Sequence, residues 1–198
     1  MKRGWTGILC LLASLPLMSG CGSFRETFPA RSGIEQMLIS TAMDRAVEKM
    51  PTAWMDGASV FVDDANLDAY DSPYLRQLLR QSVLANGGTL ADSRDDASMV
   101  LEVASGGVSV DKGNWMFGLP KIPLPIPFAG ETLVIPEAPL FRLDSYVGKA
   151  KLLFTPVDAA TKAQVREIPV CYGRSRHRFW WILLFGPFTT SDLPPEAR

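Results

Sequence analysis

Four prolines at near-alternate positions constrain the fold of this chain more than any other feature. Pro120, Pro123, Pro125 and Pro127 lie in the segment 113–140, which reads GNWMFGLPKIPLPIPFAGETLVIPEAPL. Because proline has no backbone N–H, this segment cannot be a helix interior or a central strand. We expect it to be an extended, polyproline-like excursion from the fold.

The same segment is apolar, whereas most loops are polar, and its composition argues against disorder. One interpretation is a long loop that lies over the domain's own apolar surface. The other is a surface that docks on a neighbouring subunit, another protein or the membrane interface. The residues expected to make such contacts are Trp115, Met116, Phe117, Leu119, Ile122, Leu124, Ile126 and Phe128.

A second unusual segment, residues 175–188, reads SRHRFWWILLFGPF. Its apolar part is too short to cross a membrane as a helix, which needs about 20 residues. A strand buried on both faces is one interpretation. The alternative is contact with a membrane interface, with Trp180 and Trp181 at headgroup depth and the neighbouring arginines on phosphate groups.

The N-terminus has the features of a bacterial export signal. Lys2 and Arg3 precede an apolar run, and small residues follow it, so residues 1–20 are expected to be a signal peptide. Ser19-Gly20 directly before Cys21 resembles the lipobox of bacterial lipoproteins, although Met18 occupies the place where Leu is usual. The alternative is an ordinary secretory signal that is cleaved nearby.

The lipobox resemblance implies that Cys21 is lipidated and becomes the first residue of the mature chain. Residues 21–30 would then be a lipidated tether, and residues 31–198 a single periplasmic domain. Gly22 stands where an Asp would resemble an inner-membrane retention signal, which favours the periplasmic face of the outer membrane. Cys171 is then expected to be a small buried residue in a strand, whereas an unlipidated Cys21 would favour a disulfide between the two.

Hydrophobic periodicity predicts two amphipathic helices, over residues 32–50 and 72–87. Alternation predicts strands over residues 58–63, 97–111, 146–154 and 163–172, with a β-bulge at Gly106-Gly107. The order predicts an α+β fold, with the two helices packed on one face of a mixed or antiparallel sheet.

The sequence offers little for catalysis. His177 is its sole histidine, and no nucleophile elbow, Walker loop or dinucleotide motif is present. Asp64 to Asp68 match the first positions of a calcium loop, but Ala69 and Leu75 break the pattern. We therefore expect no enzyme, no cofactor and no metal site.

The charge balance also limits the partners. Removal of Lys2 and Arg3 with the signal leaves 18 basic and 21 acidic side chains, a net charge of −3. Nucleic-acid binding is not expected, because it needs a basic face.

The stretch RSGIEQMLISTAMDRAV resembles an R-[ST]-G-x-E-Q-x-L-x-S-x-A-x-D-x-A opening in a family of uncharacterised bacterial lipoproteins. The similarity continues through VFVDDANLD, DDASMVLEV, FGLPKIPLPIP, IPEAPLF and RFWWILLFGPF, and covers most of residues 31–190. It implies an exported, lipid-anchored domain and transfers no activity or site residue. A more distant, fold-level similarity is to envelope lipoproteins with helices on a sheet, including some that assemble into outer-membrane rings.

These observations favour a non-enzymatic outer-membrane lipoprotein that acts through protein–protein contacts as an envelope structural or assembly factor. A homo-oligomeric channel or secretion component is the alternative, with residues 113–140 or 179–188 in the bilayer. A lipid-binding carrier is a third possibility. The expected partners are the membrane, through the N-terminal lipid, and a protein partner or further copies of the chain.

Overall fold

The computed structural model describes residues 31–69, 71–125, 132–183 and 185–195, all of them within one compact unit that begins at Arg31. The expected signal peptide, the tether with Cys21, and the contact residues Ile126 and Phe128 lie outside the described residues.

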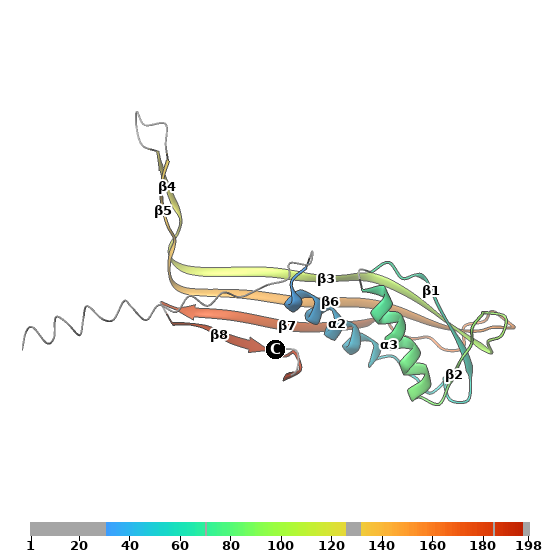
Figure 1. Cartoon of the computed structure of the whole chain (residues 1–198). Helices are drawn as coiled ribbons and strands as arrows, with labels where there is room; N and C mark the ends of the chain where they lie inside the picture. Colours follow the sequence, from blue (N-terminus) through green and yellow to red (C-terminus); the bar gives the residue numbers. More distant parts are fainter. Residues whose placement is uncertain (1–30, 70, 126–131, 184, 196–198) are drawn as a thin grey trace, which may run out of the picture. The chain divides into compact units, whose positions relative to one another are not determined.

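Strands dominate the fold, with 50% of the described residues in strands and 19% in helices. The expected α+β class is therefore wrong, and the protein is mostly β. The two expected helices are present and do lie on a mixed sheet (Figure 1).

The main sheet has six strands in the order β2-β1-β3-β6-β7-β8. β1 runs parallel to β2 and β3, and all other neighbours are antiparallel. β4 and β5 form a separate antiparallel ribbon between β3 and β6. The strand bounds are β1 Ser59–Asn66, β2 Thr89–Leu90, β3 Met99–Leu119, β4 Ile122–Pro125, β5 Thr132–Ile135, β6 Ala138–Asp158, β7 Cys171–Ile182 and β8 Phe185–Ser191.

β3 and β6 explain why the fold is richer in strand than expected, because each is 21 residues long. β3 begins in the strand that alternation predicted over residues 97–111 and continues to Leu119. The register between β3 and β6 shifts between Ser105 and Gly107, which confirms the predicted bulge. The bulge changes the phase of the apolar alternation without ending the strand.

The polyproline-like excursion expected over residues 113–140 is largely β structure instead. Its ends belong to β3 and β6, and its middle contains the β4–β5 ribbon, in which Pro123 pairs with Val134 and Pro125 with Thr132. In a two-stranded ribbon every second residue directs its N–H away from the partner strand. Prolines spaced two residues apart can occupy those positions without removing a ladder donor, so their spacing is compatible with a strand in such a ribbon.

The strand expected over residues 163–172 is also wrong. Residues 163–170 lie outside the named strands, apart from an isolated bridge between Val157 and Gln164. Pro169 cannot donate to a ladder, and β7 starts two residues later at Cys171. Cys171 is a buried free thiol in a strand, as predicted, and burial raises its pKa.

The helices are α2, Gly33–Val47, and α3, Ser72–Ala85. Ser32 and Glu35 form the predicted capping box at the start of α2. Pro73 begins α3 as expected, but Asp71 at its N-cap makes no capping hydrogen bond with its side chain. That carboxylate instead accepts two hydrogen bonds from Arg31, at 2.8 and 2.9 Å.

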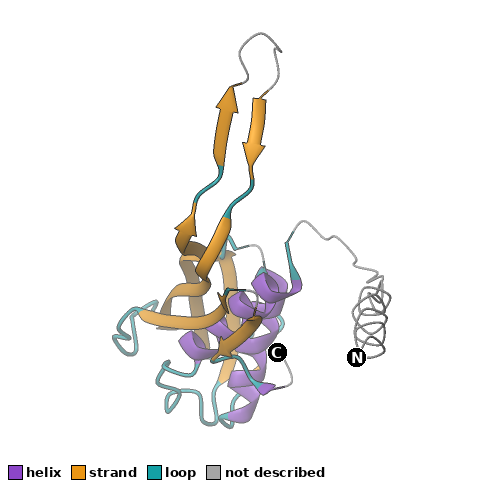
Figure 2. Cartoon of the chain, turned by 90° about the vertical axis from the view of Figure 1, so that its left-hand side faces the viewer, coloured by secondary structure: helices purple, strands orange, loops and turns teal. Residues whose placement is uncertain are grey.

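Small residues of the sheet allow α2 to pack directly on β6 and β7. Figure 2 shows the helices packed against the strands of the sheet. A Cβ added at Gly148 would lie 2.4 Å from the carbonyl oxygen of Leu38, and one at Gly173 only 1.7 Å from that of Ala42. Ser175, which pairs with Gly148, donates to the same Leu38 oxygen at 2.6 Å. We call this side of the sheet the helix face and the other side the open face.

Candidate interaction surface

The sheet has fewer strands beyond the end of β1. The last pair between β1 and β3 is Asn66 with Ala104, and beyond it the sheet continues with the strands β3, β6, β7 and β8. At the end of this four-stranded part, aromatic and aliphatic residues follow one another across the strands. We call this region the apolar end, residues 115–119, 138–143, 180–183 and 185–188.

The strand register places the apolar side chains in two rows on one face. Residues paired across a sheet point to the same face, and residues two apart in a strand do so as well. The odd-numbered Phe141 and Leu143 lie on the opposite face from Gly148, which contacts α2, so both rows lie on the open face. The rows are Trp115–Leu143–Trp180–Phe188 and Phe117–Phe141–Ile182–Phe185.

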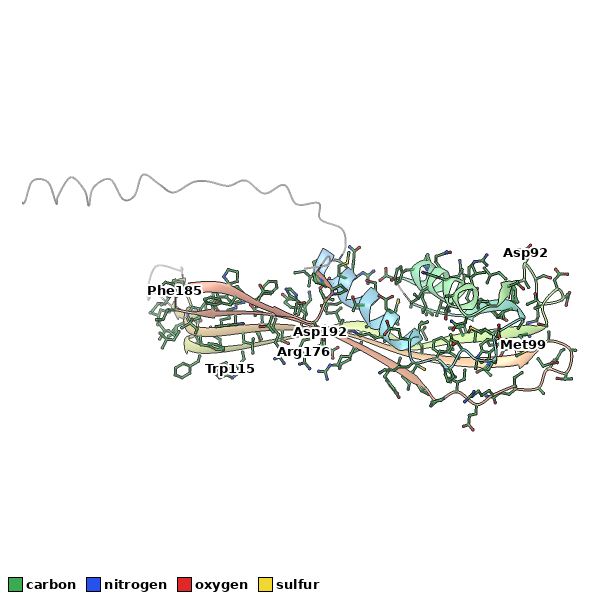
Figure 3. All side chains as sticks on the ribbon, turned by 90° about the horizontal axis from the view of Figure 1, so that it is seen from below. Asp92, Met99, Trp115, Arg176, Phe185 and Asp192 are labelled. Atoms are coloured by element: carbon green, nitrogen blue, oxygen red, sulfur yellow. The ribbon has the colours of Figure 1, made fainter. Side chains whose placement is uncertain are left out.

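Five of the eight side chains are exposed, and the other three, Phe141, Leu143 and Trp180, are half-buried. Trp115 is 58% exposed, Phe117 61% and Phe185 70%. Neither a loop that covers the domain's own apolar surface nor a strand buried on both faces describes these segments. The strands instead continue past the two helices, so the open-face rows have no layer of described residues over them (Figure 3).

Ring contacts within one row and between the two rows hold the surface in a fixed arrangement. Trp180 and Phe188 stack with ring centroids 4.5 Å apart, and Trp115 meets Phe141 edge to face at 5.5 Å. Such pairs contribute about 0.5–1.5 kcal/mol beyond simple burial. The surface is therefore ordered before any partner binds, which reduces the entropy lost on association.

The helix face of the apolar end, in contrast to its open face, carries charged side chains that form ion pairs. Arg142 donates to Glu137 at 2.8 Å and to Asp144 at 3.0 Å, and its guanidinium lies 5.9 Å from the ring centre of Trp181. The hydrogen bond to Asp144 raises the pKa of Arg142. Met116 pairs with Arg142 and shares this face. The predicted contact residues are thus divided, with Trp180 on the open face and Met116 and Trp181 on the helix face.

Cations follow the apolar rows along the open face. Arg178, Arg176 and Arg174 occupy successive open-face positions of β7, and Lys149 pairs with Arg174. Figure 3 shows Arg176 between the end that carries Trp115 and Phe185 and the opposite end at Met99. Lys149 also forms an ion pair with Asp111. Aromatic rings beside arginines are typical of surfaces that meet phospholipid headgroups or a partner protein.

The remaining predicted contacts are on β3 and β4. Leu119 is exposed at the end of β3, Leu124 is exposed in β4 and Ile122 is half-buried. The sequence reasoning missed several residues of the rows. Phe141 and Leu143 lie just beyond the segment 113–140. Ile182, Phe185 and Phe188 lie in the segment 175–188, where only Trp180 and Trp181 were expected to make contacts, and its apolar composition was the available signal.

The two adjacent aspartates in the second half of β1 form ion pairs. Asp64 pairs with Arg76, and Asp63 pairs with Arg94 at 2.6 Å. Within residues 31–195, masked positions aside, no three acidic, histidine or cysteine side chains cluster as metal ligands would. None of the described helices is long and apolar enough to cross a membrane.

A cleft of about 550 Å³ lies between α2 and α3. In it Tyr74 donates to Asp44 at 2.7 Å, and burial together with this carboxylate raises the pKa of Tyr74 to about 12. The phenol therefore stays protonated at neutral pH and does not act as a base there. The cleft has both polar and apolar walls.

The fold and the surface define a mostly-β protein with an uncovered aromatic face at one end of its sheet. The model of a family of unknown function, DUF6655, matches residues 17–194, so the chain belongs to this family. A search of the curated proteins finds no match to the chain.

Proposed function

We propose that the protein is a non-enzymatic envelope lipoprotein that acts through protein–protein contacts, as a structural or assembly factor. The two open-face rows of the apolar end support this proposal most directly. Soluble monomeric domains rarely expose several adjacent aromatic side chains, and such a patch usually marks an interaction site. Its ordered ring contacts and neighbouring arginines match the composition of protein interfaces, which favour aromatic residues and arginine.

The proposal includes the location. Cys21 carries the lipid, residues 21–30 tether the domain, and the domain faces the periplasm from the outer membrane. A lipidated N-terminus confines the domain to the membrane surface, which raises its effective concentration toward other membrane-bound proteins. Cys21→Ala should release the chain from the membrane fraction, and the mass of the N-terminal peptide should report the lipid.

Site-specific photo-crosslinking in cells tests the contact function. A photoreactive residue at Phe117 or Phe188 in the full chain should give protein adducts, because both positions lie on the exposed rows. The matched control is Val165, an exposed apolar residue outside the named strands. In a chain probed at Phe188, Phe117→Ser should weaken the adduct without changing the amount of membrane-bound protein. Equal adducts from all three positions, or none from the rows, would contradict the proposal.

A further inference from the structure

We propose that the partner of the apolar end is a second copy of this chain, joined edge to edge with β8 of one copy beside β3 of the next. The inference rests on the proposed function and names its partner. It follows from the free edges of the four-stranded part, from their directions and from the side chains that each edge presents.

Both outer strands of the four-stranded part have an open side. Past Ala104, β3 pairs with β6 alone among the described residues, and β8 pairs with β7 alone. Most of β3 beyond the bulge and most of β8 are exposed. An open strand edge presents unpaired N–H and C=O groups and is a template for another strand.

The register shows which backbone groups face outward on β3. Leu183 donates its N–H to the carbonyl of Leu140, so even-numbered β6 residues bond to β7 and odd-numbered ones bond to β3. Leu143 is therefore hydrogen-bonded to its partner Trp115. By alternation, the N–H and C=O groups of Lys112, Asn114 and Met116 point away from β6, and none of these residues is a proline that would block pairing.

The same alternation applies to β8. Asp192 donates its N–H to the carbonyl of Arg176, so Phe188 and Thr190 bond to β7 while Thr189 points its N–H and C=O outward. Pro187, two residues earlier, has no N–H and adds no donor to this edge. The complementary donors and acceptors are therefore those of Thr189 on β8 and of Lys112, Asn114 and Met116 on β3.

The strand directions allow antiparallel pairing between copies that have the same orientation relative to the membrane. β3 runs toward the apolar end, and β6, β7 and β8 alternate after it, so β8 runs back. A neighbouring β3 beside β8 is therefore antiparallel to it, and an even number of strands per copy keeps the alternation intact. Copies anchored through their N-termini in one membrane leaflet need this common orientation.

The side chains also match across such a seam. Trp115 at the β3 edge and Phe188 at the β8 edge both belong to the open-face row, so the aromatic rows would continue from copy to copy. On the helix face, Asn114 and Thr189 share a row. Because the two edges differ, the contact is head-to-tail. Such a contact gives a ring where the rotation between copies closes and an open filament where it does not.

Cysteine crosslinking of the full-length chain in its membrane tests the seam. The double variant Asn114→Cys/Thr189→Cys carries one thiol on each edge, both on exposed helix-face positions. A short bis-maleimide should convert it into a ladder of dimers, trimers and larger species, because every copy has both edges. Co-produced single variants, Asn114→Cys with Thr189→Cys, should stop at dimers. The unsubstituted chain, whose Cys171 is buried, is the reagent control.

Val165→Cys/Thr189→Cys is the matched control pair and should give no ladder, since Val165 lies outside both edges. Efficient dimers from Asn114→Cys alone would overturn the inference, because they indicate two-fold pairing of β3 with β3. An absent ladder would also overturn it. If Phe188 adducts then contain a different protein, the proposed contact function survives without the self-pairing. If Phe188 gives no adduct either, both proposals fail.

Discussion

The two halves of β6 place their apolar side chains on opposite faces of the sheet and in opposite surroundings. Near α2, β6 places Ala150, Leu152 and Phe154 in the core, and each is at most 2% exposed. At the apolar end the same strand carries Phe141 and Leu143 in rows that no described element covers. One sheet thus provides a folding core in one half and a contact surface in the other.

The two halves are therefore expected to have different roles, one in the stability of the fold and the other in binding a partner. Burial of a large apolar side chain contributes about 1.5–3 kcal/mol relative to its exposure, so residues beneath α2 stabilise the fold. The open-face rows of the apolar end retain much of their contact with water. Their burial by a partner would stabilise a complex, and their loss should affect the isolated fold little.

The largest expected contrast is between two phenylalanines. Phe154→Ala should lower the free energy of unfolding by about 3–5 kcal/mol, because it leaves a cavity under the helices. Phe117→Ala, at a position 61% exposed, should lower it by less than about 1 kcal/mol. Urea unfolding of the full-length protein in detergent, followed by circular dichroism, measures both. Similar losses for the two variants would contradict the division of the sheet.

Two glycines give a smaller contrast. Gly173→Ala forces α2 away from β7, since the new Cβ would lie 1.7 Å from the carbonyl oxygen of Ala42, and should cost about 1–3 kcal/mol. Gly113→Ala adds a Cβ with nothing within 4 Å, and the change should stay within about 0.5 kcal/mol. The same unfolding assay applies. A neutral Gly173→Ala would show that α2 does not need the close approach.

The smallest effect concerns the ion pair that joins α2 to β3. Glu35 accepts from Lys112, and this hydrogen bond lowers the pKa of the carboxyl group. When the pKa of a carboxyl group is lower in the folded state than in the unfolded state, the group stabilises the fold. This stabilisation is fully present at pH values above the unfolded-state pKa, and it is lost as the pH falls through the folded-state pKa.

Glu35→Gln keeps the reciprocal cap but removes the charge. The variant should be slightly less stable than the parent at neutral pH and equally stable in acid below both pKa values. Unfolding curves across that range measure the difference. A gap that persists in acid would assign the effect to the cap and not to Lys112.

Local patterns in the sequence were sufficient for the elements near the core. The capping box at Ser32, the helical apolar spacing and the bulge at Gly106-Gly107 depend on interactions within a few residues, and the structure confirms them. The balance of the fold was predicted wrongly because β3 and β6 continue far beyond the expected strands, and because Pro123 and Pro125 were expected to exclude strand pairing. A proline is compatible with a strand when its nitrogen points away from the neighbouring strand, and only the position of that strand decides this.

The sequence by itself determined the two helices, the bulge and the apolar character of residues 113–119 and 179–188, because each depends on composition or short-range periodicity. Only the tertiary structure decided that these two segments meet on neighbouring strands, and that their rows lie on the face away from α2. Alternation in a strand predicts that its two faces differ in polarity. Which face is covered depends on where the helices pack on the sheet. That position is fixed by contacts such as Gly173 with Ala42, far apart in the chain.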